Sequence, residues 1–124
     1  MATITYSDFQ SVMNLTISDI SAINTEKILD LAIDCLNLYG NLELSNLQGT
    51  AGSKTVSVES KQKAAIYLVA RAVYYSFFKG LTSAAIQGLN VSSPDLLSDP
   101  TVLESIREAA GNLQETEWAR AFYH

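Results

Sequence analysis

Two carboxylates lie four residues apart in this chain, and they are the first candidates for chemistry. On the helix predicted for this segment, Asp30 and Asp34 lie one turn apart and face the same way. Such a pair could bind a metal ion or take part in acid–base catalysis. Because no third ligand lies nearby in the sequence, we favour an acidic helix face that meets solvent or a partner. Metal binding or catalysis is kept as the alternative.

The other residue types that carry catalysis are scarce. The only histidine, His124, is the last residue of the sequence, where we do not expect packing to hold it for a Ser–His–Asp or Cys–His arrangement. The only cysteine, Cys35, falls within a predicted helix and is interpreted as a buried structural thiol. Residues 49–54, GTAGSK, lack the spacing of a phosphate-binding P-loop. We therefore expect no enzymatic activity, no metal site and no cofactor.

Composition and charge favour one acidic globular domain. The chain has 124 residues, 48% of them apolar, and its net charge of −5 argues against non-specific binding to nucleic acid or an anionic membrane. Five of the eight basic residues fall within 54–79, between two acidic flanks. This pattern suits head-to-tail self-association and equally a monomer's solvated surface. Residues 1–10 lack a signal-peptide pattern, and no uncharged run reaches the roughly 20 residues of a membrane span, so we expect a soluble protein made in a reducing cytoplasm.

The element that dominates the sequence is a long helix predicted over Glu59–Lys79. Between Ala64 and Phe78 only Arg71 and Ser76 interrupt its apolar residues. A helix that is apolar nearly all round is expected to be buried on several sides, so we expect another copy or a partner to cover part of it. One side is aliphatic, and the other combines tyrosines with an arginine, as the centres of interfaces do. This second side either lines the protein's own core or forms a subunit interface, and it comprises Tyr67, Arg71, Tyr74, Tyr75 and Phe78.

Three further helices complete the predicted fold. Ser7 and Gln10 have capping-box spacing at the first helix, Asn24 has the type of an N-cap at the second, and Asp99 followed by Pro100 is typical of a helix start. We therefore predict an all-α, four-helix domain with a long central apolar helix. The predicted helices are Thr5–Asn14, Thr25–Tyr39, Glu59–Lys79 and a fourth from Pro100 to a point between Asn112 and Trp118.

The segments between the helices are predicted to be loops with little β structure. Residues 42–44 and 56–58 alternate apolar with polar side chains, which predicts a small β-hairpin. Residues 89–91 show the same alternation, which predicts a short strand. We assign residues 1–114 to the helical domain and residues 115–124 to an extended C-terminal docking tail.

The predicted tail, ETEWARAFYH, is rich in aromatic residues. Chain ends are ordinarily polar and frayed unless they are tied down. Trp118, Phe122 and Tyr123 therefore suggest docking into a groove. That groove belongs either to the tail's own domain or to a neighbouring or different subunit.

Four segments, taken in order, carry a family resemblance. They are SDFQSVMNLT, EKILDLAIDCLNLYG, GTAGSKTVSV leading into KQKAAIYLVARAVYYSFFK, and GLNVSSPDLLSDPTVLESIREAA. In the order of its elements and in its residue types, including an aromatic-rich long helix that ends in YYSFFK, the chain resembles the head–tail connector (adaptor) proteins of tailed bacterial and archaeal viruses. The likeness covers about residues 7–113 and includes no catalytic signature.

The resemblance implies a structural protein of the virion neck, between head and tail. Family members form a closed ring, typically of twelve copies, on the portal protein. The ring extends the DNA channel, through which viral DNA passes without specific binding, and it carries the next neck or tail component. Loops 41–55 and 81–97 would touch neighbouring subunits or that component. The C-terminal segment would clamp the portal through Trp118, Arg120, Phe122 and Tyr123.

Charge suggests how neighbouring copies would meet. We predict that the acidic arc of one subunit, Glu26, Asp30 and Asp34, approaches Lys61 or Lys63 of the next. Two alternatives to the connector stay open: a generic helical homo-oligomeric interaction module, and a small helix-turn-helix regulator. The net charge of −5, and an acidic arc where phosphates would lie, argue against the regulator.

Overall fold

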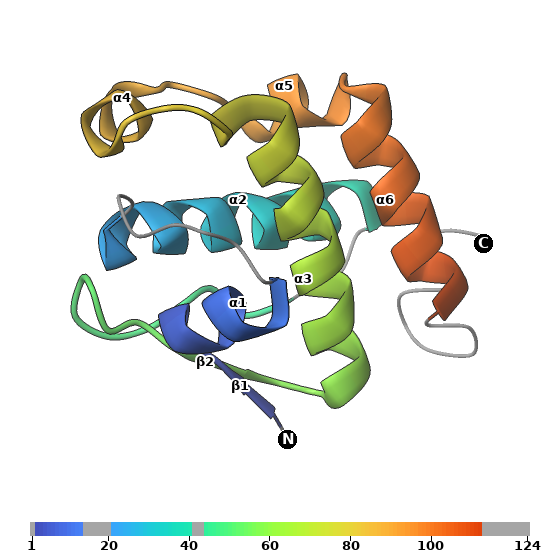
Figure 1. Cartoon of the computed structure of the whole chain (residues 1–124). Coiled ribbons are helices and arrows are strands. Elements are labelled where there is room, and N and C mark those ends of the chain that lie inside the picture. Colours follow the sequence, from blue (N-terminus) through green and yellow to red (C-terminus); the bar gives the residue numbers. More distant parts are fainter. Residues whose placement is uncertain (1, 14–20, 41–43, 113–124) are drawn as a thin grey trace.

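A computed structural model describes residues 2–13, 21–40 and 44–112 (Figure 1). Helices hold 68% of these residues and a two-stranded sheet holds a small part, which confirms the predicted mainly α-helical class. In chain order the elements are β1 (Ala2–Ile4), α1 (Tyr6–Met13), α2 (Ala22–Gly40), β2 (Val56–Val58), α3 (Ser60–Val73), the π-helix η1 (Tyr74–Phe78), α4 (Ser83–Gly88), α5 (Ser93–Leu97) and α6 (Pro100–Asn112).

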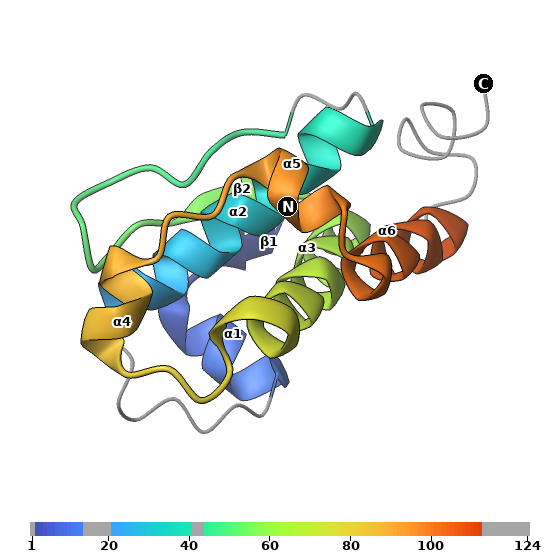
Figure 2. The same ribbon diagram turned by 90° about the horizontal axis from the view of Figure 1, so that it is seen from above.

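Helix α3 is packed on several sides by its own chain. It contacts α2 and α6 most extensively, and it also contacts α1 and β1 (Figures 1 and 2). Ile66, Val69, Ala70 and Val73 are fully buried. Most of the apolar surface for which we expected another copy is therefore covered within the chain.

The ends of this long helix follow local sequence signals. Glu59 precedes α3 and forms a capping box with Gln62, whose Oε1 accepts the Glu59 N–H at 3.0 Å. Beyond α3 the helix widens into the π-helical turn η1, where the Lys79 N–H donates to the Tyr74 carbonyl at 2.8 Å. Gly80 follows with a φ of 84°, a left-handed conformation that glycine adopts readily at helix ends. The helix predicted over 59–79 is thus present, with a π-helical last turn.

The sheet joins the start of the chain to β2 and is not the predicted hairpin. β1 and β2 are antiparallel, with Ala2 opposite Val58. Leu44 is outside any strand, because the Asn37 side-chain amide binds both of its backbone groups, at 2.9 and 3.1 Å. Residues 41–43 lie outside the described residues. The strand predicted at 56–58 is therefore present as β2, but it pairs with β1 and not with residues 42–44.

Two predicted helix caps are wrong by a few residues. Helix α2 begins earlier, and the Ser21 Oγ accepts the Asn24 N–H at 3.2 Å. Asn24 is buried inside the helix, and its amide donates to the Ser83 Oγ at 2.7 Å. At α1, Thr5 and Asp8 form the capping box, with reciprocal bonds of 3.1 and 3.2 Å. Serine, threonine, asparagine and aspartate all cap helices well, so neighbouring candidates cannot be ranked from local sequence.

The segment 81–97 contains α4 and α5, and the short strand predicted at 89–91 is not formed. The Lys27 Nζ on α2 donates to the carbonyls of Ile86 and Leu89, at 2.8 and 2.6 Å. These carbonyls lie at the C-terminal end of α4, where a cation is favoured by the helix dipole. Lys27 therefore ties α4 to α2.

Helix α6 begins at Pro100, as predicted. The Asp99 carboxylate accepts the Thr101 N–H at 2.8 Å, which caps the helix and confirms the role assigned to Asp99. The face of α6 that packs on α3 is apolar, and its buried residues include Val102, Ile106 and Ala109.

Candidate interaction surfaces

The last turn of the long helix displays an aromatic ring between two cations. Tyr75 is 44% exposed. The Arg71 guanidinium carbon lies 5.8 Å from the centre of its ring, and the Lys79 Nζ lies 5.1 Å from it. Both cations are exposed, and an exposed cation–π contact contributes about 0.5–1 kcal/mol. We call Arg71, Tyr75 and Lys79 the Tyr75 surface.

The structure narrows the interface that was predicted on this helix. Tyr67, Tyr74 and Phe78 are buried within the chain, with exposed fractions of 2%, 8% and 0%. Tyr67 meets Phe9 edge-on with ring centres 6.3 Å apart, and burial raises the pKa of its hydroxyl. Of the five predicted residues, only Arg71 and Tyr75 are exposed and available to another copy.

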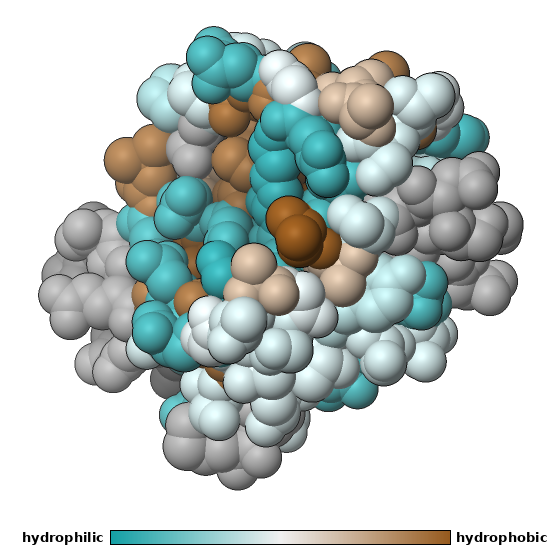
Figure 3. All heavy atoms as spheres, turned by 90° about the vertical axis from the view of Figure 1, so that its left-hand side faces the viewer, coloured by the Kyte–Doolittle hydropathy of each residue, from teal (hydrophilic) through white to brown (hydrophobic). Residues whose placement is uncertain are grey.

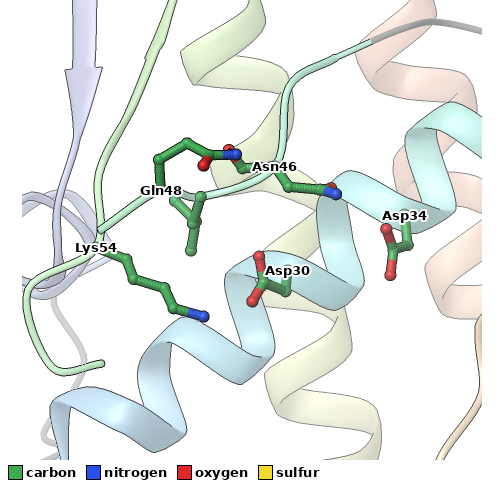
Figure 4. A pocket seen from close by; sticks show the side chains of 6 residues that line it. Asp30, Asp34, Asn46, Gln48 and Lys54 are labelled. Atoms are coloured by element: carbon green, nitrogen blue, oxygen red, sulfur yellow. The ribbon is translucent and has the colours of Figure 1, made fainter. Parts of the chain in front are cut away.

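A hollow of about 420 Å³ brings together the two carboxylates singled out by their spacing (Figure 4). Asp30 and Asp34 project from α2 beside the segment 46–48, the Asn46 side chain extends in the direction of Asp34, and the Lys54 side chain extends toward Asp30 (Figure 4). We call this site the Asp30–Asp34 hollow, and its lining residues are Asp30, Asp34, Asn46, Leu47, Gln48 and Lys54.

The pKa values of both carboxyl groups of the hollow are raised above the ordinary value for aspartate. Burial raises the pKa of Asp30, the Lys54 ammonium opposes this rise, and the neighbouring Asp34 carboxylate adds to it. Burial also raises the pKa of Asp34. The ionised pair is therefore destabilising in the isolated fold, and an approaching cation would relieve it.

Replacing Asp30 with asparagine should stabilise the fold at neutral pH. Because the folded-state pKa lies above the ordinary value of 3.8, the folded protein binds more protons than the unfolded chain just above pH 3.8. The free energy of unfolding thus falls as the pH rises through that window. We expect Asp30→Asn to be more stable than wild type at pH 7, by up to about 1 kcal/mol after solvent screening, and equally stable near pH 3. Urea denaturation at several pH values measures this difference.

Asp95 provides the control of opposite sign. The Ser92 hydroxyl and backbone N–H donate to its carboxylate at 2.8 and 3.1 Å and lower its pKa. That stabilisation is present above pH 3.8 and is lost as the pH falls through the folded-state pKa. Asp95→Asn should therefore be less stable than wild type at pH 7. Equal responses of the two variants would contradict the environments assigned to them.

Glu26 does not belong to an exposed acidic arc, so this prediction is wrong. It is only 3% exposed, and its two carboxylate oxygens accept the backbone N–H groups of Gly52 and Lys54 at 3.0 and 2.7 Å. Gly52 has a φ of 93°, which suits glycine, and the turn closes where Gln48 pairs with Thr55. Glu26 therefore fixes the 49–54 turn, which leads into Lys54 of the hollow.

The face that carries this turn has no wide apolar area among its described residues. Figure 3 views the side of the molecule where α4, the start of α2 and the turn lie, and its brown areas are small and divided by teal. A second hollow of about 280 Å³ lies there, with Ile23 and Ala51 among its lining residues.

The two predicted lysines of the interface have different surroundings. The Lys63 Nζ lies 3.6 Å from the Asp8 carboxylate and donates to the Thr3 carbonyl at 3.1 Å. Lys63 thus contributes to the chain's own N-terminal packing. Lys61 is exposed, and within the described ranges no acidic group pairs with it.

The remaining sequence expectations fall partly outside the described residues. Cys35 is fully buried, as expected. Within residues 2–13, 21–40 and 44–112, no group of three or more His, Cys, Asp or Glu residues is arranged to hold a metal ion. No helix in those same ranges has the length and apolar character to cross a membrane. The predicted tail lies outside the described residues, including Trp118, Arg120, Phe122, Tyr123 and His124.

Sequence reasoning missed two lysines that matter to these surfaces. Lys79 follows Tyr75 by four residues, as Tyr75 follows Arg71, so helical spacing could have added it to the predicted interface. Lys54 reaches the hollow only because the 49–54 turn folds back on α2, and no local pattern indicates that.

Fold and surfaces together define a small, mainly α-helical domain with a cation–aromatic surface and a separate acidic hollow. In comparisons with known proteins, no family model, no curated protein and no solved structure matches this chain.

Proposed function

We propose that the protein is a structural head–tail connector in the neck of a tailed virus. The observation that carries this proposal is the pairing of a self-contained helical core with two charged surfaces of opposite sign on different elements. Such a subunit is suited to bind copies of itself in series. In this role a ring of copies extends the DNA channel of the portal and holds the next neck or tail component, without enzymatic activity. The sequence resemblance supplies the viral context.

The working unit in this proposal is a helical domain over residues 1–114, in which the four longer helices predicted from the sequence form the frame and α4 and α5 are short additions. The long helix formed by α3 and η1 lies at its centre, and α1, α2 and α6 pack around it. Residues 115–124 act as the docking tail on the portal. The acidic balance of the chain, −5, lets DNA pass the ring without binding to it.

A homo-oligomeric interaction module outside any virion is the second candidate. The same pair of surfaces supports it, because self-association alone requires no portal. Electron microscopy of the protein mixed with the portal protein of the same genome separates the two. The connector should add a ring of density at the tail-facing end of the portal, whereas the module should leave the portal unchanged.

Trp118→Ala tests the docking tail. Removing a large buried anchor from an interface commonly costs about 2–4 kcal/mol, so portal binding should weaken by that amount. The isolated subunit should keep its melting temperature. Calorimetric titration of portal with wild type, Trp118→Ala and the conservative Trp118→Phe measures the loss. A variant that unfolds would instead place the tail in the core of its own domain.

A further inference from the structure

The Tyr75 surface carries two positive charges, and no acidic side chain among the described residues pairs with either of them. Within the described residues, the two ion pairs closer than 4 Å are Lys63–Asp8 and Arg107–Glu104, and neither involves Arg71 or Lys79. Arg71 and Lys79, which both lie near the Tyr75 ring, are therefore exposed cations without a described acidic partner. They stand out in a chain whose net charge is −5. A half-exposed tyrosine between such cations has the composition of an interface anchor.

The Asp30–Asp34 hollow presents the complementary chemistry. It holds two carboxylates, and Lys54 offsets one of these charges, so the hollow remains acidic. It lies between α2 and the segment 46–48, whereas α3 packs on another face of α2 (Figures 2 and 4). The hollow is lined by residues of α2 and of the segment 46–54, whereas the Tyr75 surface lies on α3 and η1 and the residue after it. The two surfaces share no residue, so they can form the two sides of one contact between copies.

We propose that the Tyr75 surface of one copy binds the Asp30–Asp34 hollow of the next copy. Arg71 and Lys79 pair with the two carboxylates, and the Tyr75 hydroxyl donates to a polar group of the hollow. Because the two surfaces differ, the contact is heterologous and repeats from copy to copy, as in a ring or a filament. This contact rests on the proposed function in one respect, that copies assemble in series, and it replaces Lys61 and Lys63 as the basic side of the interface.

A second copy fits the Tyr75 surface better than a nucleic acid does. Two cations on a chain of net charge −5 provide few of the phosphate contacts that support binding to a duplex. The hollow, by contrast, offers two carboxylates to two cations, and it is present at one site on every copy. Binding of a DNA duplex that competes with self-association is therefore a result that would overturn the proposal.

A charge exchange tests the contact directly. Arg71→Glu places an acid opposite the acidic hollow, and Asp34→Arg places a base opposite the basic surface. Each variant alone should self-associate at least about tenfold more weakly than wild type, because like charges face each other across the contact. An equimolar mixture should recover assembly, since every junction in an alternating assembly then joins opposite charges. Native mass spectrometry, alone and on the portal, counts both variants in each assembly.

Controls keep the result specific. Both altered side chains are exposed, so neither variant should melt below wild type, and Asp34→Arg should melt at the same temperature or higher because it relieves the repulsion on Asp30. Lys61→Glu changes another exposed base of the long helix and should leave assembly unchanged.

Single variants that assemble like wild type would overturn this contact while portal binding still supported the connector. If the two variants assemble only when mixed, and wild type has no affinity for the portal, the result would support this contact and contradict the connector. Wild-type protein that stays monomeric both alone and mixed with the portal would overturn the contact and the connector together.

Discussion

Glu26→Ala is expected to lower the free energy of unfolding by about 3 kcal/mol, because it leaves two buried backbone donors without a partner. The Glu26 carboxylate accepts the N–H groups of Gly52 and Lys54, and it is almost fully buried. A hydrogen bond to a charged group contributes about 1.5–3 kcal/mol, and the two bonds share one carboxylate, so their loss is not fully additive. Urea denaturation at pH 7 measures the change.

Hydrogen exchange locates this effect within the molecule. In Glu26→Ala the amides of Gly52 and Lys54 should lose protection before those of α3. Glu26→Gln keeps one carbonyl acceptor and should fall between wild type and the alanine variant. Glu108→Ala removes an exposed acid and should stay within about 0.5 kcal/mol of wild type. Equal stability of Glu26→Ala and Glu108→Ala would contradict the clamp on the 49–54 turn.

Phe78→Ala is expected to lower the free energy of unfolding by about 3–5 kcal/mol, the usual range for removing a phenylalanine from a packed core. Phe78 is fully buried in η1, although its position in the sequence also allowed a role between subunits. The loss combines apolar burial with the cavity left behind, so it should appear in the isolated monomer. Denaturation at a concentration where the protein is monomeric measures it.

Tyr75→Ala is the matched control, because it removes a neighbouring aromatic side chain from the same turn. Tyr75 is 44% exposed, so its loss should change the stability of the monomer by less than about 1 kcal/mol. Its effect should instead appear in self-association. The reverse pattern, a stable Phe78→Ala that no longer assembles and a Tyr75→Ala that unfolds, would contradict the division of this helix into core and surface.

Features with a local cause were predictable from the sequence. The long helix, its break at Gly80 and the start of α6 after Asp99 follow from apolar spacing, a left-handed glycine and an aspartate–proline pair. These signals act over a few residues, and no distant part of the chain has to be placed first. The strand at 56–58 also followed from local alternation.

Features with a distant cause were not predictable in the same way. The partner of β2 is β1, more than fifty residues away in sequence, and a short strand specifies its partner weakly. In the sequence Glu26 could not be distinguished from Asp30 and Asp34, because the 49–54 turn that buries it is distant in the chain. The tyrosines of the long helix could face a core or a partner equally well, because both environments favour the same residues.

As proposed above, the protein binds a portal as a serial assembly of identical copies. Native mass spectrometry of the purified protein, alone and mixed with the portal protein of the same genome, tests it most directly. The connector predicts a complex that carries many copies per portal ring, in a fixed number. A stable dimer with no affinity for the portal would contradict the claim, and it would leave the Tyr75 surface as a simple two-fold interface.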